Sequence, residues 1–464
     1  MASNGHVRRL CRSITFLRGQ FWLILRAVSS ILYRGGRIHA ASDPGAQALL
    51  VDGGAVAWIG TNDTADGLAA RADRVIELDG ALVAPGFVDA HFHALATGQA
   101  LGAPDRLSAY RAALGQAAAQ GIVAVHEFSN PATDTREGLS ELMGVSVYEH
   151  FPQVLAYRGE LLTSTEAGLE LKEALPFLAG FSGARVDGSM SEGAAAMRQP
   201  YLNVAQVPGL TYDDQYGRLE LTAEQIATHL AASQTAGLPG GLHVEGDRAM
   251  DEFLAGLSLA ADMLGGAELG AKNLRSGQHR IEHALFVDAV AMATLLLYGV
   301  SLSIQPASTA ASSNSGGAWA KGLGVARMAN VGPIADVTGA GVRIALGSGS
   351  PGAPLDPWLA IRAAVEHPDE SQRLSSLASF RAHTVGGWQI AGFADEGAGE
   401  LAVGNPAHLA VWRAENYGVY DPTRPLWAGE PEDLPLLPDM TPGSAPPECL
   451  HTLRAGVPIH DTFS

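Results

Sequence analysis

Residues 83–93 read VAPGFVDAHFH, an apolar run that ends in two histidines. A short apolar run bounded by turn residues is typical of a fully buried strand, and we predict one over Val88–His93. Side chains alternate along a strand, so His91 and His93 project to the same side. Imidazole is a preferred ligand of zinc and similar divalent metals. The stretch therefore predicts a buried strand that ends in a pair of metal ligands.

The middle of the chain alternates short apolar strands with helical stretches. Helices are expected between most of the strands, for example over residues 106–120 and 223–236. Eight strands that alternate with helices predict an α/β fold, the (β/α)8 TIM barrel. A doubly wound sheet is the alternative, but no GxGxxG follows the first strand. The predicted strands are Val88–His93, Ile122–Glu127, Val154–Tyr157, Ala184–Asp187, Gly241–Val244, Arg280–His283, Val300–Gln305 and Arg343–Ser348.

Both ends of the chain read as short strands joined by tight turns. Asp-Gly pairs at residues 52–53 and 79–80 stand between apolar runs, which is a strong hairpin signal. The C-terminal residues show the same pattern of short strands and tight turns. We predict one small β-sandwich domain that is built from residues 31–83 and 398–464, and a barrel domain over residues 84–397.

Composition narrows the possible partners. The formal net charge is −18, which argues against a protein that coats nucleic acid, because phosphate binding needs a positive surface. Hydrophobic residues make up 47% of the chain, as expected for a large globular core. The two cysteines cannot build a disulfide framework, so we expect a cytoplasmic protein. The sequence carries no signal for an oligomeric state.

The N-terminal segment differs from the remainder. Residues 1–37 contain seven arginines and no acidic residue, and the apolar run at 21–25 lies between two of those arginines. A span of a bilayer needs roughly 20 apolar residues. We interpret residues 1–30 as a basic extension of doubtful authenticity, either an irregular extension or the result of a start codon placed too early. A surface anchor or targeting peptide is the alternative, so membrane contact is expected only if the extension is real.

Further histidines end later predicted strands, at the barrel end where such folds place their function. His126 ends the second strand, His243 the fifth and His283 the sixth. A His-x-His pair followed by single histidines at later strand ends indicates a metal site more strongly than the pair alone. Arg280 is interpreted as a solvated side chain, and the Gly/Ser-rich run 308–317 as a loop over the barrel mouth.

These motifs resemble the signatures of the amidohydrolase superfamily. More narrowly they are similar to its amidohydrolase-3 group, the exoenzyme-regulator-like and N-substituted formamide deformylase-like hydrolases. The matches run in order from about residue 31 to residue 460. Besides VAPGFVDAHFH they include GIVAVHE (121–127), DGS (187–189), HVEGDRA (243–249) and HRIEHA (279–284).

The resemblance implies a metal-bearing barrel with a β-sandwich. It also implies hydrolysis of a non-peptide carbon–nitrogen bond, in an amide or cyclic amide of a small-molecule substrate, by a metal-activated water. The ligand positions of one divalent ion, with zinc as the expected metal, map onto His91, His93, His243 and His283. Gln305 ends the seventh predicted strand, and we expect it to bind a polar group of the substrate.

Three departures from the family pattern bear on activity. The strand-eight motif normally ends in an aspartate that accepts a proton, but Gly349 stands at that position. Many relatives carry a bridging lysine four residues before the Asp-Gly of strand four, where this chain has Gly183. The long insertion that typically follows the His-x-His pair is mostly absent, because only residues 94–120 separate the pair from the second strand.

Three carboxylates are candidates to replace the missing acid. Glu245 lies two residues beyond His243, so strand alternation aims both side chains the same way. Glu127 follows His126, and Asp187 precedes a Gly-Ser pair typical of a turn. We predict Glu245 and Glu127 as replacement general bases. The alternative is a degenerate, catalytically impaired protein of the same fold that acts as a binding or interaction protein.

Overall fold

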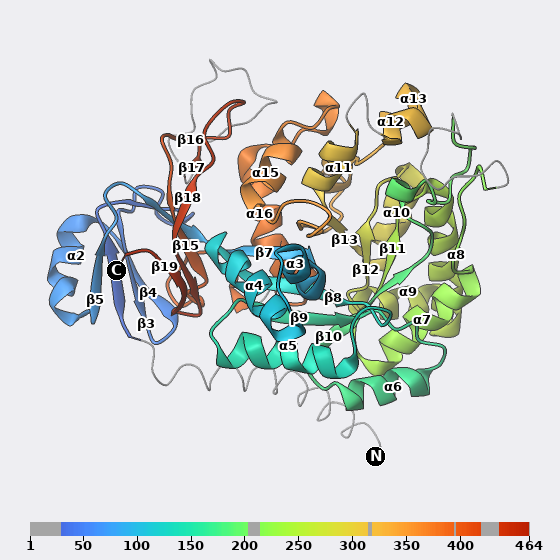
Figure 1. Cartoon of the computed structure of the whole chain (residues 1–464), viewed down its shortest axis with the longest axis horizontal. Coiled ribbons are helices and arrows are strands. Elements are labelled where there is room, and N and C mark those ends of the chain that lie inside the picture. Colours follow the sequence, from blue (N-terminus) through green and yellow to red (C-terminus); the bar gives the residue numbers. More distant parts are fainter. Residues whose placement is uncertain (1–28, 203–213, 314–317, 394–395, 419–435, 464) are drawn as a thin grey trace.

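The structure is a computed structural model that describes residues 29–202, 214–313, 318–393, 396–418 and 436–463. It consists of an eight-stranded barrel surrounded by helices and a smaller β-rich part beside the barrel (Figure 1). The predicted basic extension, residues 1–30, lies almost wholly outside the described residues and stays a prediction.

The barrel sheet follows the order β14-β13-β12-β11-β10-β9-β8-β7, and all its ladders are parallel. This arrangement confirms the predicted (β/α)8 TIM barrel. The first strand is buried along its whole length, as expected where helices cover one face and barrel side chains the other. The strands are β7 (Phe87–Phe92), β8 (Ile122–Ser129), β9 (Gln153–Arg158), β10 (Leu178–Arg185), β11 (Gly240–Val244), β12 (Arg280–His283), β13 (Ser301–Ile304) and β14 (Ile344–Leu346).

The barrel closes at the seam between β7 and β14. An isolated parallel bridge joins Phe92 to Ser350, just beyond the end of β14. The buried carboxylate of Asp89 accepts hydrogen bonds through Oδ1 from the backbone N–H groups of His91 (3.0 Å) and Ser348 (2.9 Å). At the seam, the Asp89 side chain thus accepts hydrogen bonds from backbone N–H groups that backbone oxygens accept between the other barrel strands.

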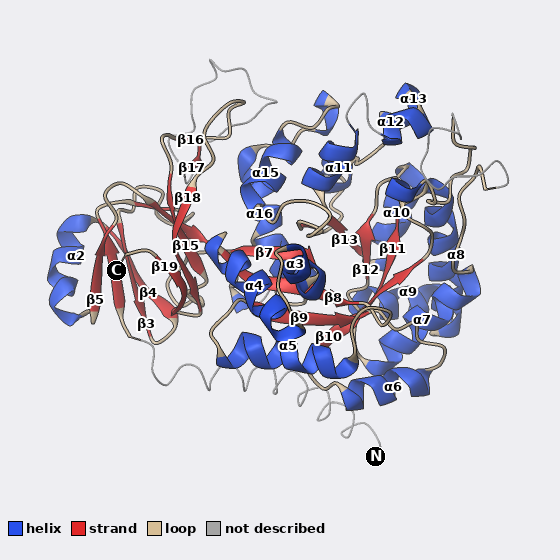
Figure 2. Cartoon of the chain, viewed as in Figure 1, coloured by secondary structure: helices blue, strands red, loops and turns tan. Residues whose placement is uncertain are grey.

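Helices cover the outside of the barrel sheet (Figure 2). Several begin at a side chain that accepts a hydrogen bond from a backbone N–H of the first turn. Asp105 begins α4 in this way, and Thr222 begins α7 in a capping box with Gln225. The helices are α3 (Ala94–Ala100), α4 (Arg106–Ala119), α5 (Arg136–Tyr148), α6 (Thr165–Ala174), α7 (Ala223–Ala236), α8 (Asp247–Met263), α9 (Gly266–Ser276), α10 (Ala289–Tyr298), α11 (Pro306–Ser313), α12 (Ala318–Leu323), α13 (Val325–Met328), α14 (Ile334–Gly339), α15 (Pro357–Val365), α16 (Ser376–His383) and α17 (Val385–Ile390). Within the described ranges, none is long and apolar enough to cross a membrane.

The fourth barrel strand differs from its prediction. It was expected over residues 184–187, but β10 begins at Leu178, and Asp187 lies beyond its end. Glycine is depleted in strands, and Gly180 and Gly183 interrupt the apolar pattern of its first half. A β-bulge interrupts the pairing of β10 with β11 around Gly183, whose φ is 132°.

The segment after the seventh strand also differs. Residues 306–313 form helix α11 instead of the predicted loop over 308–317, and residues 314–317 lie outside the described part. Proline is well tolerated at the first position of a helix, and Pro306 occupies it here. Alanine, which recurs along this segment, has the highest helix propensity.

Two further sheets lie beside the barrel and combine strands from both chain ends. Their orders are β4-β3-β1-β5 and β19-β18-β15-β6-β2, so that β15 pairs with β6. The predicted domain boundaries stay predictions. The elements of this part are β1 (Ile31–Arg34), β2 (Arg37–Ile38), β3 (Ala48–Asp52), β4 (Ala55–Gly60), α2 (Asn62–Leu68), β5 (Arg74–Glu77), β6 (Leu82–Pro85), β15 (Leu409–Arg413), β18 (Glu448–Arg454) and β19 (Val457–Asp461), with a small pair β16 (Tyr417–Gly418) and β17 (Leu437–Pro438).

The barrel and the β-rich part share a hydrophobic core around Trp412 of β15. This indole is fully buried, and its ring centroid lies 5.3 Å from that of Trp358 and 5.7 Å from that of Phe87. Phe87 starts the first barrel strand and Trp358 lies on α15. Edge-to-face aromatic contacts of this kind add to the burial of apolar area. The aromatic cluster therefore fixes the β-rich part to the start of the barrel.

We predict that Trp412→Ala lowers the free energy of unfolding by about 3–5 kcal/mol, because it leaves a cavity in this shared core. Denaturant unfolding followed by far-UV circular dichroism measures the change. Val403→Ala, at a side chain that is 64% exposed, is the control and should stay within about 0.5 kcal/mol of wild type. A loss below about 1 kcal/mol for Trp412→Ala would contradict the shared core.

Candidate metal centre

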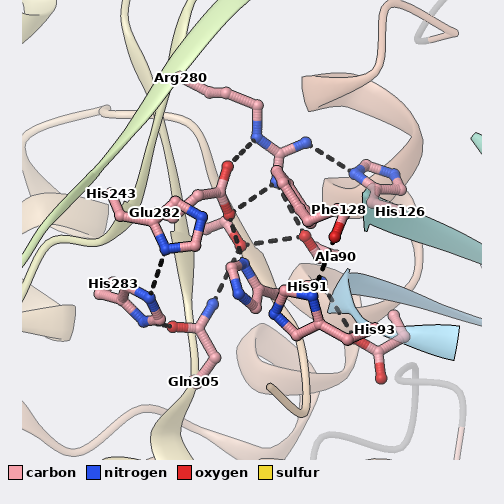
Figure 3. Close-up of polar contacts among 12 residues, drawn as sticks. Ala90, His91, His93, His126, Phe128, His243, Arg280, Glu282, His283 and Gln305 are labelled. Carbon is pink, nitrogen blue, oxygen red and sulfur yellow. Dashed lines mark hydrogen bonds and ion pairs between the residues drawn. The ribbon is translucent and has the colours of Figure 1, made fainter. Parts of the chain in front are cut away.

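Three histidines from different parts of the sequence meet at the C-terminal end of the barrel. His91 comes from β7, His243 from β11 and His283 from the end of β12. One ring nitrogen of each lies within 4.8 Å of one from each of the other two, and Figure 3 shows the rings turned toward one another. The parallel barrel places all three strand ends on one edge of the sheet. These are three of the four histidines predicted as ligands.

Hydrogen bonds from the outer ring nitrogens orient two of these imidazoles. His91 donates from Nδ1 to the Glu282 carboxylate at 2.8 Å, and His283 donates from Nδ1 to the Gln305 amide oxygen at 2.9 Å. Such bonds leave Nε2 of each ring with its lone pair, which is the arrangement typical of metal-binding histidines. His283 also has a φ of 71°, an uncommon conformation for this residue type.

His93 lies beside the group but not within it. Its ring centroid is 5.1 Å from that of His91, and its Nδ1 donates to the backbone oxygen of Phe128 at 3.0 Å. Its outer nitrogen is therefore held in the same manner as that of His91. Its part in metal binding stays a prediction.

The donor set fits a divalent cation. His283 Nε2 lies 3.1 Å from His243 Nδ1, so the His243 ring donates to it, in a bond that a metal ion at His283 Nε2 would displace. His243 Nε2 keeps its own lone pair. That Nε2 is buried without a hydrogen-bond partner among the described residues. Burial holds the pKa of His91 and of His243 well below the usual value. These two imidazoles are therefore neutral, which is the form that binds metals.

A buried ion pair supports His91 from below. Arg280 and Glu282 are both fully buried, and Arg280 Nε donates to Glu282 Oε1 at 2.6 Å. The prediction of a solvated Arg280 is therefore wrong. The guanidinium also donates to the Ala90 oxygen at 2.8 Å and to His126 Nδ1 at 2.7 Å (Figure 3). His126 thus belongs to the barrel interior and not to the group of three histidines.

A polar cavity of about 190 Å³ opens above the histidines. It contains Glu245 and Gln305, two of the predicted site residues, but not Glu127. Gln305 donates from Nε2 to Ser303 at 3.1 Å besides accepting from His283, so both ends of its amide are held. The lining consists of His91, His93, Arg185, Ser189, Ser191, His243, Glu245, His283, Leu285, Gln305, Ser308, Thr309, Trp319, Gly349 and Gly352.

The three candidate carboxylates have different environments. Glu245 accepts from the backbone N–H of Met190 at 2.6 Å and lines the cavity. Glu127 accepts from the N–H of Ala94 at 2.7 Å, at the start of α3, and burial raises its pKa to about 8. Asp187 accepts from the backbone N–H groups of Glu245, Gly246 and Ala196 at 2.8–3.0 Å. Glu245 alone of the three faces the cavity, and Asp187 holds the backbone that carries it.

The two departures at glycine have structural consequences. Gly349 lines the cavity with a φ of 68°, and a Cβ built there would lie 3.4 Å from Gln305 Cγ. A Cβ at Gly183 would lie 3.0 Å from the Gly159 Cα, with φ at 132°. The local backbone of β10 therefore disfavours a lysine at 183, while position 349 has room for a short side chain.

Sequence reasoning missed Glu282 and Asp89. Glu282 lies between two residues that were noticed, Arg280 and His283, and its shared strand face with Arg280 was an available signal. Asp89 lies two residues before His91, and it bonds to the far seam only because the barrel closes there.

Glu282→Gln should weaken binding of a divalent ion by about 10- to 100-fold, because the amide is a poorer acceptor for His91 Nδ1–H and leaves Arg280 without its counter-charge. Chelator competition measures the affinity. Asp134→Asn is the matched control, since this buried carboxylate bonds to Tyr110 instead of a histidine. Equal affinities of Glu282→Gln and wild type would show that the carboxylate does not support the site.

The chain is similar to known proteins in both sequence and fold. Residues 103–460 match the model of the Amidohydrolase family. A curated relative, the exoenzymes regulatory protein AepA of Pectobacterium carotovorum subsp. carotovorum, is 36% identical over 69 residues. That match covers 14% of this chain and 15% of the relative's length.

Solved structures share the fold at low identity. A metal-dependent hydrolase from Pyrococcus horikoshii OT3 is 18% identical, with a TM-score of 0.65 over 85% of this chain and 98% of that one. A mutant of atrazine chlorohydrolase from Arthrobacter aurescens TC1, complexed with zinc and atraton, is 13% identical, with a TM-score of 0.58 over 93% and 96%. These likenesses show the fold alone. The family model matches most of the chain, and the protein therefore belongs to the Amidohydrolase family.

Proposed function

We propose that this protein is a metal-dependent hydrolase that cleaves a non-peptide carbon–nitrogen bond in a small-molecule amide or cyclic amide. The group of three imidazoles within 4.8 Å of one another, which line a polar cavity, carries the proposal. Membership of the Amidohydrolase family supports it. The cavity of about 190 Å³ suits a small substrate.

The proposed metal ligands are His91, His243 and His283, with His93 as the fourth. All four line the cavity. Imidazole sets of this kind suit zinc, and a structural neighbour was solved with zinc. A divalent ion held here would polarise a substrate carbonyl oxygen and lower the pKa of a water molecule.

The remaining chemistry falls to residues of the cavity. Glu245 is the proposed general base, which accepts the proton that water loses and returns it to the leaving nitrogen. The hydrogen bond from Met190 N–H holds its carboxylate in place. Gln305, already engaged with His283 and Ser303, is the proposed contact to a polar group of the substrate through its remaining bonding capacity.

A second function is favoured by one observation. Gly349 lines the cavity where relatives carry the strand-eight aspartate, so this chain offers no carboxylate at that position. A protein that kept the fold and the imidazoles but lost its proton acceptor would bind ligands without turning them over.

Protein purified without added metal should contain about one divalent ion per chain, and zinc reconstitution should support hydrolysis of amides or cyclic amides. The double variant His91→Ala/His93→Ala should lose both the metal and the activity. Elemental analysis and a substrate panel are the measurements. His150→Asn removes an exposed histidine and is the control. Failure of wild type to bind zinc would refute the proposed site.

Glu245→Gln should lower kcat by about 10²- to 10⁴-fold while the metal content stays unchanged, because only proton transfer is lost. Glu192→Gln, an exposed carboxylate of the neighbouring loop, is its control. Gly349→Asp tests the degenerate alternative, since aspartate tolerates positive φ better than most residues. Our proposal expects little gain from Gly349→Asp. A large gain in kcat for Gly349→Asp, together with an unchanged kcat for Glu245→Gln, would favour the degenerate alternative, in which the proton acceptor has been lost.

A further inference from the structure

Arg185 is a cation that faces the cavity without a counter-charge. It is the last residue of β10, is exposed and lines the cavity mouth. It pairs in register with His243 on β11. Among the described residues, no carboxylate lies within ion-pair distance of its guanidinium, and no side-chain hydrogen bond engages it. The chain carries a net charge of −18, so an unpaired arginine at this place is notable.

The local backbone aims Arg185 at the site. The β-bulge between Ser182 and Ala184 interrupts the pairing of β10 just before this residue. Bulges next to functional sites commonly re-aim a side chain.

Within the part of the chain that the structure describes, Arg185 is the only lysine or arginine that lines the cavity. Glu245 shares the cavity, but its carboxylate is held by Met190 N–H. Ser189 and Ser191 also line the cavity, and their hydroxyl groups add hydrogen-bond donors. A cation that no described carboxylate neutralises, with hydrogen-bond donors beside it, is suited to an anionic group of a ligand.

We propose that Arg185 binds a carboxylate of the substrate, so that the substrate class is small amides with a carboxylate close to the scissile bond, as in N-acyl amino acids. This inference rests on the proposed function. A single guanidinium matches a carboxylate through two parallel hydrogen bonds. The amide would then lie between Arg185 and the imidazoles, and the carboxylate would fix its orientation.

The test uses a panel of N-acetyl amino acids, each paired with its carboxamide, which has the same scissile bond but no charge. Calorimetric titration of metal-free and zinc-loaded protein measures binding, and kcat/KM measures turnover. Wild type should prefer the carboxylate by about tenfold or more in both forms, the strength of a charge-assisted hydrogen bond. Arg185→Gln should remove most of that preference, because the carboxylate loses its charged partner.

Arg218→Gln is the matched control, because Arg218 is exposed and lies outside the cavity lining. It should keep the full preference. Equal binding of both panel members by wild type, or a preference that survives Arg185→Gln, would overturn the inference. Tighter Arg185-dependent binding of inorganic phosphate than of any carboxylate would also overturn it.

The two proposals fail in different ways. Carboxamides and carboxylates that are hydrolysed alike would leave the hydrolase standing and remove the role of Arg185. Arg185-dependent binding of carboxylates to both protein forms, without hydrolysis of any panel member or cyclic amide, would support the anion subsite and count against the hydrolase.

Discussion

The site depends on an ion pair that is buried inside the barrel. Arg280 and Glu282 are both fully buried, which is tolerated only when charges are paired and their remaining donors satisfied. The guanidinium meets this condition through Glu282, the Ala90 oxygen and His126, and it lies 4.9 Å from the Tyr157 ring centroid. These partners belong to four strands. The pair therefore ties the strands together directly beneath His91, which Glu282 orients.

The site also lies beside the seam of the barrel. Asp89 bonds to backbone on both sides of that seam, and Gly349 N–H donates to the His91 oxygen at 2.9 Å. The same residues that close the barrel thus fix the backbone of a proposed metal ligand. Burial in apolar surroundings disfavours the charged form of Asp89 and raises its pKa to about 6. The closure of the barrel and the placement of His91 therefore depend on the same hydrogen bonds.

Sequence patterns predicted the barrel because its strands are short apolar runs spaced by helices, a signal that depends on local residues alone. Two features depended on contacts between strands, which the local sequence does not show. Residues 178–183, most of β10, were missed because glycine breaks the pattern, and the bulge at Gly183 exists only in the paired sheet. Arg280 was misjudged because burial of a charge is decided by its partners, which come from other strands. The histidines were found from their strand ends, but their mutual distances required the closed barrel.

The polar groups of the cavity are unevenly distributed, and this bears on how the chain manages without a strand-eight acid. Arg185 ends β10, His243 lies in the adjacent β11 and Glu245 directly follows β11, whereas the segment after β14 contributes only Gly349 and Gly352 to the lining. A carboxylate at position 349 would place a negative charge on the side of the cavity that Gly349 and Gly352 line. Its absence, with Glu245 present, moves the charged groups of the cavity toward β10 and β11. On our proposals, the proton acceptor and the substrate anchor then come from neighbouring strands, and Asp187 fixes the backbone of the proton acceptor through the N–H groups of Glu245 and Gly246.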